Sequence, residues 1–147
     1  MFLAGGVESM SRAPIVMSKA QTAFDRTQEI ADSTLGARFT NPAFASAYGN
    51  DTMPQTADNI ASDIGITREE SDKFAAASQA KYEAARADGF FKDEIIPIEV
   101  PQGRKKPPLT VDADEHPRAQ STVEALSGLR TLFPDGVVTA GNASGIN

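Results

Sequence analysis

The chain closes on Val138-Thr139-Ala140-Gly141-Asn142-Ala143-Ser144-Gly145, a β-branched run that leads into a turn with two glycines. Glycine lacks a Cβ, so such a turn bends sharply and leaves backbone amides where a ligand can lie against them. The run lacks the lysine of a phosphate-binding loop and the spacing of a dinucleotide motif, so motif chemistry alone favours a plain strand-to-helix turn. The sequence leaves two roles open for Asn142: its side chain either shapes a pocket or caps a following helix.

The composition of the 147 residues, 40% hydrophobic and 23% charged, is that of a soluble globular protein. Fourteen basic and twenty acidic residues give a net charge of -6, which disfavours attraction to nucleic acid or anionic lipid. No cysteine is present, which excludes disulfides, thiolate zinc sites and thiol catalysis in the chain, and the single histidine, His116, argues against a histidine metal site. No apolar run approaches the roughly 20 residues that cross a bilayer. Without a secretory signal pattern, the expected location is the cytoplasm by default.

Two consecutive helices are predicted in the middle of the chain. Pro54 fits the first turn of a helix that runs to about Asp63 and ends at Gly65. Thr67-Arg68-Glu69-Glu70 is a capping-box pattern that starts the second helix, and Gly89 stands where a left-handed C-terminal cap belongs. The positions expected on the two apolar stripes are Ala57, Ile60, Ala61 and Ile64, followed by Phe74, Ala77, Ser78, Lys81, Tyr82 and Ala85.

Short strands and loops are predicted on either side of these helices. Met1–Gly6 indicates the end of a strand, whereas residues 15–50 show no clear hydrophobic period and indicate an irregular segment with short helical turns. Residues 94–100 and 109–111 predict the strands of a small hairpin, with Pro97 at an edge or bulged position.

A second capping-box pattern, Ser121-Thr122-Val123-Glu124, predicts a short helix through Arg130. Pro134-Asp135-Gly136 then makes a turn into the return strand at Val137. With a strand end at its start and a turn at its finish, the sequence is expected to be a piece cut from a longer protein.

Four stretches resemble signatures of the thiolase family, in the family's order and over nearly the whole length. Ordered matches of this kind are hard to obtain by chance. With Thr52 before Met53, the sequence resembles the degradative 3-oxoadipyl-CoA thiolases. Biosynthetic acetoacetyl-CoA enzymes usually carry a histidine just before that methionine. The stretches are Ala4-Gly5-Gly6-Val7-Glu8-Ser9-Met10-Ser11-Arg12-Ala13-Pro14, Asp51-Thr52-Met53-Pro54-Gln55-Thr56-Ala57-Asp58-Asn59, Asp112-Ala113-Asp114-Glu115-His116-Pro117-Arg118 and Thr139-Ala140-Gly141-Asn142-Ala143-Ser144-Gly145.

The resemblance implies an α/β fold, α+β within this segment, in which two related α/β halves form five layers. Residues 1–14 would end a core strand and turn of the N-terminal half. Residues 15–135 would form an inserted loop domain that covers the active site and binds coenzyme A, and residues 136–147 would return to the core. The nucleophilic cysteine would precede Met1, and the activating histidine and acid/base cysteine would follow Asn147, so no catalytic residue is expected here.

The activity that the resemblance implies is that of an acyltransferase, which cleaves a 3-oxoacyl-CoA by transfer of its acyl group to coenzyme A. 3-Oxoadipyl-CoA is the expected substrate, and a general acetyl-CoA acetyltransferase is the alternative within the family. Coenzyme A would be a co-substrate, no cofactor would be bound covalently, and the full-length enzyme would be a dimer or tetramer of identical subunits. A stand-alone acyl-CoA-binding module is the rival hypothesis, and an oligomerisation arm is compatible with either.

The resemblance also assigns binding residues. Coenzyme A joins an anionic nucleotide to a thin amide-bearing arm, so its site needs cations outside and a narrow apolar channel with hydroxyl or backbone partners inside. Arg118 matches the position near the nucleotide, where a guanidinium stacks on a base or binds phosphate. Ser144 matches a hydroxyl that bonds an arm amide. The positions matched to the channel are Met53, Phe133 and Ala140, together with Phe44 from the poorly aligned segment.

Without the resemblance, these residues have simpler roles. Arg118 would be a surface arginine, and Met53 and Phe133 would be core residues. The basic turn Arg104-Lys105-Lys106 is expected to be a solvated edge rather than a phosphate site. His116 is outside the family's catalytic histidine motif and is interpreted as a structural or surface residue.

Overall fold

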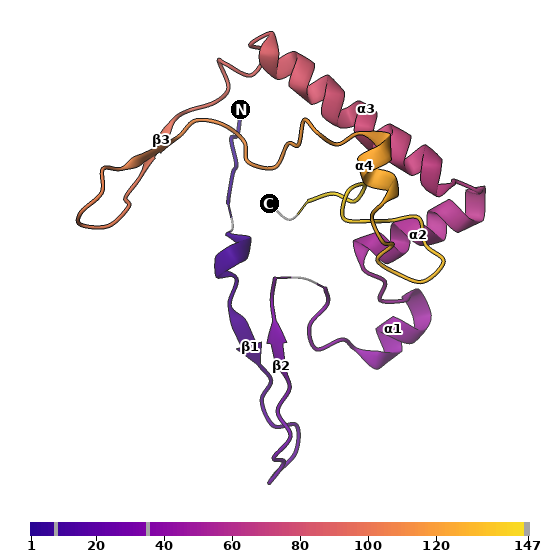
Figure 1. Ribbon diagram of the computed structural model, residues 1–147. Coiled ribbons are helices and arrows are strands. Elements are labelled where there is room, and N and C mark those ends of the chain that lie inside the picture. Colours follow the sequence, from indigo (N-terminus) through magenta and orange to yellow (C-terminus); the bar gives the residue numbers. More distant parts are fainter. Residues whose placement is uncertain (8, 35, 146–147) are drawn as a thin grey trace. The chain divides into compact units, whose positions relative to one another are not determined.

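The computed structural model describes residues 1–7, 9–34 and 36–145 (Figure 1). Glu8 of the predicted opening segment and the last two residues of the predicted return segment lie outside the described residues. The chain forms two compact units, Met1–Thr56 and Ala57–Gly145. The domain boundaries expected at residues 14 and 135 remain a prediction. Among the described residues, no helix combines the length and apolar character of a bilayer-spanning segment.

The first unit contains a short 3-10 turn, η1 (Met10–Arg12), and a two-stranded antiparallel sheet of β1 (Ile15–Met17) and β2 (Ile30–Asp32). Val16 lies opposite Ala31 in this pairing. The prediction of an irregular segment therefore missed a hairpin, because three-residue strands are too short to show a hydrophobic alternation. The strand predicted at Met1–Gly6 is also wrong for the described residues, which place no strand before β1.

A short helix, α1 (Pro42–Tyr48), completes the regular structure of the first unit. The side chain of Asn41 caps it by accepting a hydrogen bond from the Ala43 amide at 2.9 Å, and proline occupies the first turn. Gly49 ends the helix with a φ of 79°, a left-handed conformation that glycine adopts without strain. This helix agrees with the short helical turns predicted for the segment.

Two helices follow at nearly the predicted positions, α2 (Met53–Ile64) and α3 (Arg68–Ala87). At the start of α3 both halves of the capping box are present, because the Thr67 hydroxyl accepts from the Glu70 amide and the Glu70 carboxylate accepts from the Thr67 amide. Glycines with positive φ follow each helix, Gly65 and Gly89. Local signals thus set both ends of α3.

The buried face of α3 differs from the predicted apolar stripe. Phe74 is 79% exposed, whereas the residue with the least exposure on the helix is Asp72, at 1%. Gln79, two turns further along the same face, is partly buried and accepts a hydrogen bond from the Arg118 amide. The prediction followed the apolar side chains, but α3 presents polar side chains to the segments that cross it because they meet specific partners there.

The remaining elements are β3 (Ile98–Val100), β4 (Leu109–Val111) and α4 (Val123–Ser127). The strands pair antiparallel, Glu99 opposite Thr110, which confirms the predicted hairpin with a shorter first strand that begins after Pro97. Thr122, one residue later than predicted, caps α4, and this helix ends three residues before Arg130. The predicted return strand at Val137 is reduced to one isolated bridge, Thr131 to Thr139, because no longer partner strand flanks it among the described residues.

The core of the second unit is small and lies along the return segment, with side chains contributed by α2, α3 and α4. Its buried apolar side chains are Ala61, Leu126 and Val138, and the fully buried Thr139 and the buried Asp72 lie beside them. A core that combines few apolar groups with buried polar ones depends on those polar groups being satisfied. The hydrogen bonds around Asp72 and Thr139 are therefore the feature that organises this unit.

Candidate functional site

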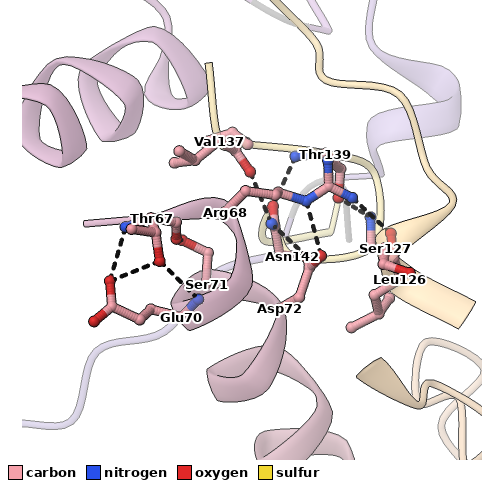
Figure 2. Close-up of polar contacts among 12 residues, drawn as sticks. Thr67, Arg68, Glu70, Ser71, Asp72, Leu126, Ser127, Val137, Thr139 and Asn142 are labelled. Carbon is pink, nitrogen blue, oxygen red and sulfur yellow. Dashed lines mark hydrogen bonds and ion pairs between the residues drawn. The ribbon is translucent and has the colours of Figure 1, made fainter. Parts of the chain in front are cut away.

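Asp72 is the centre of a buried polar network on α3 (Figure 2). Its Oδ2 accepts a hydrogen bond from Arg68 Nε at 2.8 Å, one helical turn earlier. Arg68 also donates through Nη2 to the backbone oxygen of Leu126, at 2.6 Å, and so connects α3 to α4. A buried carboxylate needs such charge-assisted partners, because an unpaired charge away from water is strongly unfavourable.

Asn142 joins this network to the terminal turn. Its Nδ2 donates to Asp72 Oδ1 and to the Val137 oxygen, both at 2.9 Å, and its Oδ1 accepts from the Thr139 amide at 2.7 Å. Both amide protons and the amide oxygen are therefore used (Figure 2). The side chain therefore fixes the turn around it, and the two interpretations left open by the sequence remain predictions.

The terminal turn is closed by hydrogen bonds to Thr139, which is fully buried. The Thr139 oxygen accepts from the Ala143 amide at 3.0 Å, and its Oγ1 accepts from the Gly141 amide at 3.1 Å. Gly141 lies so close to α4 that a Cβ at this position would be 2.6 Å from Leu129 Cδ1 and would also overlap the Leu126 side chain. A side chain at this position would therefore force these leucine side chains to shift.

Asp58 of α2 holds the residues that lead into this turn. Its Oδ1 accepts from the amides of Val137 at 2.8 Å and Val138 at 2.9 Å. Its Oδ2 is buried and has no hydrogen-bond partner among the described residues. Gly136 packs against this carboxylate, where a Cβ would lie 2.7 Å from Cγ. Carboxylates on α2 and α3 thus fix the return segment before and within its turn.

The segment that carries Arg118 is attached to the same helix, α3. Gln79 Oε1 accepts from the Arg118 amide at 2.8 Å, and the Tyr82 hydroxyl donates to Asp114 Oδ2 at 3.1 Å. Tyr82 also stacks on Phe91 with 5.1 Å between ring centroids. Loss of water around the phenol and the hydrogen bond to Asp114 raise the pKa of Tyr82. Within the second unit, α3 therefore contacts both segments for which the sequence predicts ligand-binding residues, the segment of Arg118 and the return segment.

The predicted binding residues of the second unit lie on these two segments. Ala140 and Ser144 are exposed at the ends of the terminal turn, and Phe133 is partly buried on the same segment upstream. The Ser144 hydroxyl makes no hydrogen bond within residues 57–145, and the exposed Arg118 guanidinium has no ion-pair partner there. The structure brings Ala140 and Ser144 onto one turn and links Arg118 to them through α3.

The two other predicted binding residues belong to the first unit. Met53 is the first residue of α2 and is exposed, and Phe44 is exposed on α1, where its ring lies 5.0 Å from that of Tyr48. Their placement beside the channel remains a prediction. In the second unit, a cavity of about 620 Å³ is lined mainly by apolar groups, among them Ile60, Ile64 and Phe74. None of the predicted binding residues lines this cavity.

Residues that the sequence analysis did not assign make most of the contacts. Arg68 and Asp72 have the i,i+4 spacing of a helical ion pair, which was a usable signal, but nothing local marked this pair as buried. The roles of Asp58 and Gln79 could not be predicted from neighbouring residues, because their hydrogen-bond partners are 79 and 39 residues away in the sequence. His116, interpreted as a structural or surface residue, is exposed, and its imidazole packs so closely on Gly145 that a Cβ there would overlap the ring.

Comparisons with known proteins identify the class and then the family. The chain has the mixed helix-and-strand fold of human mitochondrial 3-ketoacyl-CoA thiolase in complex with CoA, with a TM-score of 0.72, 38% identity, and coverage of 94% of this chain and 33% of that one. The predicted α/β fold class is thereby confirmed. The family model for the thiolase N-terminal domain matches residues 1–147, so the chain belongs to the thiolase family.

Curated relatives show which thiolases the chain is similar to. A beta-ketoadipyl-CoA thiolase of Acinetobacter baylyi is 56% identical over 148 residues, which cover 100% of this chain and 37% of that protein. An acetyl-CoA acetyltransferase of Allochromatium vinosum is 49% identical over 99% of this chain and 36% of its own length. The chain thus spans little more than a third of the relatives it matches.

Proposed function

We propose that this chain is the coenzyme A-binding part of a thiolase, and that the full-length protein cleaves 3-oxoadipyl-CoA. The observation that carries the proposal is the 56% identity to a beta-ketoadipyl-CoA thiolase across the whole chain. Thr52 before Met53, the feature that resembles the degradative enzymes, supports the same substrate. The solved complex of a structural neighbour with CoA supports the ligand.

The chemistry of the terminal turn suits the arm of coenzyme A. Ser144 offers an exposed hydroxyl that can donate to or accept from an arm amide, and Ala140 beside it presents only a methyl group. Arg118 supplies a cation for the nucleotide end, in a chain whose net charge of -6 would otherwise repel phosphates. Phe133, Met53 and Phe44 are proposed to contribute apolar surface to the channel.

The proposed reaction needs a thiolate that this chain does not contain. In the full-length enzyme a cysteine thiolate attacks the 3-oxo carbon, and the bond between C2 and C3 breaks. Its electron pair takes up a proton, which releases acetyl-CoA and leaves the shortened acyl group on sulfur. The thiol of free coenzyme A then attacks that acyl group and regenerates the cysteine. The residues of this chain bind and orient the coenzyme A moieties in both steps.

Exposed apolar surface favours this proposal over a stand-alone module. Ile64 is 70% exposed and Phe74 is 79% exposed at the rim of the 620 Å³ cavity in the second unit. Side chains of this size on one surface mark a region that other protein normally covers. An independent acyl-CoA carrier would leave them in water, whereas the remainder of a thiolase can cover them.

The test uses the full-length protein with 3-oxoadipyl-CoA and free coenzyme A, and follows acetyl-CoA formation. We expect thiolysis, and we expect Ser144→Ala to raise the KM for coenzyme A about fivefold, which corresponds to one neutral hydrogen bond of about 1 kcal/mol. Arg118→Ala should raise this KM more at low salt than at high salt, because salt screens an exposed charge. Arg86→Ala, which removes an exposed arginine paired with Glu83, is the matched control. A KM unchanged in both Ser144→Ala and Arg118→Ala would disprove the assigned binding role.

An acetyl-CoA acetyltransferase is the second candidate, favoured by the 49% identity to the Allochromatium vinosum enzyme. The ratio of kcat/KM for 3-oxoadipyl-CoA to that for acetoacetyl-CoA separates the two candidates. A ratio well above one supports the degradative enzyme, and a ratio below one supports the acetyltransferase. The homo-oligomer that we also propose can be checked on the same preparation by its mass in solution.

A further inference from the structure

We propose that Asp72 and Asn142 are positioning residues for coenzyme A, which act by fixing the turn that presents Ser144. This inference rests on the proposed function, because it assumes that Ser144 contacts the ligand. Neither side chain is proposed to touch coenzyme A. Asp72 is 1% exposed, and the donors and acceptor of the Asn142 amide are used within the protein.

The Asn142 amide can adopt only one orientation. Asp72 offers a carboxylate, which accepts hydrogen bonds and cannot donate them when ionised. The amide nitrogen of Asn142 must therefore face Asp72, and its oxygen must face the Thr139 amide, as the distances of 2.9 and 2.7 Å show. A flipped amide would oppose oxygen to oxygen and lose both contacts.

This orientation of the Asn142 amide sets the path of the turn. Asn142 bonds Val137 before the turn and Thr139 at its start, while the Thr139 oxygen accepts from the Ala143 amide. These contacts leave little freedom between residues 137 and 143. Ser144 is the next residue, so the closed turn sets where its backbone, and with it the hydroxyl's point of attachment, lies.

Asp72 connects the turn to a rigid support, the helix α3. Arg68 holds the other carboxylate oxygen and bonds Leu126 of α4, and the capping box at Thr67 fixes the helix one turn before Asp72. A hydroxyl that must meet an arm amide within hydrogen-bond distance gains from such support, because small displacements weaken binding steeply. The turn is thus held by a helix as well as by its own hydrogen bonds.

A merely structural pair would give a different result from a positioning pair. Loss of a structural contact lowers the fraction of folded protein but leaves the coenzyme A affinity of the folded fraction unchanged. Loss of a positioning contact lowers that affinity, and only while the Ser144 hydroxyl is present. The two roles are therefore separated by a double-mutant cycle on the dissociation constant.

The experiment measures coenzyme A binding by calorimetry to the folded full-length protein and to Asn142→Ala, Ser144→Ala and the double variant. Ser144→Ala is expected to weaken binding about fivefold, the equivalent of one neutral hydrogen bond. Asn142→Ala is expected to weaken it by about the same factor, and the double variant should be no weaker than either single one, within about twofold. Glu69→Gln, which alters an exposed carboxylate on the same helix, is the control that should bind normally.

One outcome would contradict the binding role of Ser144, and another would contradict only the positioning role of Asp72 and Asn142. If Ser144→Ala binds as well as the unaltered protein, Ser144 does not contact coenzyme A, and the proposed function of the turn fails together with this inference. If Ser144→Ala weakens binding but Asn142→Ala has no effect, or the two effects multiply, the binding assignment survives and the positioning role is wrong.

An exchange of the two groups keeps the test decisive if Asn142→Ala does not fold. Asp72→Asn combined with Asn142→Asp restores one donor and one acceptor across the contact, although Val137 loses its donor. We expect the combination to bind coenzyme A more tightly than Asn142→Asp alone, in which two carboxylates face each other. No recovery in the combination would contradict the inference.

Discussion

Two ion pairs on α3 allow the contribution of burial to be measured on one helix. Arg68–Asp72 and Lys73–Glu69 share the i,i+4 spacing and nearly the same separation, 2.8 and 2.7 Å. Their acidic side chains differ, since Asp72 is 2% exposed and Glu69 is 71% exposed. Asp72→Ala removes an acceptor from both Arg68 and Asn142, whereas Glu69→Ala removes one solvated partner.

The structure allows the cost of Asp72→Ala to be estimated. Breaking a fully buried pair costs about 3–5 kcal/mol, because the remaining charge is left unpaired. Arg68 is 25% exposed and keeps its bond to the Leu126 oxygen, so water and this carbonyl compensate part of that cost. We therefore expect Asp72→Ala to destabilise the turn by about 2–3 kcal/mol. For Glu69→Ala we expect almost no change, since exposed pairs contribute little.

Amide hydrogen exchange in the full-length protein measures this effect locally. Peptides that cover residues 137–145 should exchange about 30- to 150-fold faster in Asp72→Ala, since 1.4 kcal/mol corresponds to a factor of about ten. Peptides from the β3–β4 hairpin provide an internal reference, and Glu69→Ala should leave residues 137–145 unchanged. Equal exchange in the two variants would refute the conclusion that Asp72 organises this unit.

Three further predictions address the helix start, the packing of the turn and the Arg118 segment. Hydrogen bonds from the backbone and hydroxyl of Thr67 lower the pKa of Glu70, so its contribution to stability is present above the unfolded value of about 4.5 and is lost as the pH falls through the lower folded value. Acid unfolding followed by circular dichroism should therefore lose part of its pH dependence below 4.5 in Glu70→Gln. Gly141→Ala should destabilise the protein by about 1–3 kcal/mol, seen as a lower Tm, because the added methyl overlaps α4; an unchanged Tm would mean that the turn shifts freely. Gln79→Ala should raise the KM for coenzyme A a few-fold and leave kcat unchanged if the Arg118 amide needs its acceptor, and steady-state kinetics with the Arg86→Ala control decide this.

Elements whose signals are local were predictable from the sequence. The capping box at Thr67 and the glycine at residue 89 set the limits of α3, because the groups that satisfy the helix ends lie within one turn of them. The β3–β4 hairpin was found for a similar reason, since few residues separate its strands. The pairing of β1 with β2 was missed, because strands of three residues carry too little pattern.

The residues of the candidate site likewise fall into those that the sequence predicted and those that only the structure showed. Arg118 and Ser144 were selected from the sequence by their resemblance to family motifs, and the turn at Gly141 was expected from its glycines. The buried face of α3 was predicted wrongly, because apolar periodicity does not show that Asp72 is paired with Arg68 and receives a hydrogen bond from Asn142. The roles of Asp58 and Gln79 were likewise invisible.

The amino-acid sequence by itself determined the thiolase family, the helices α2, α3 and α4, and the residues proposed to meet coenzyme A, since each depends on neighbours in the chain or on an ordered set of motifs. Only the tertiary structure decided how the terminal turn is held. Asp72 and Asn142 are 70 residues apart, and their hydrogen bond exists because folding removes both from water and leaves each as the other's partner.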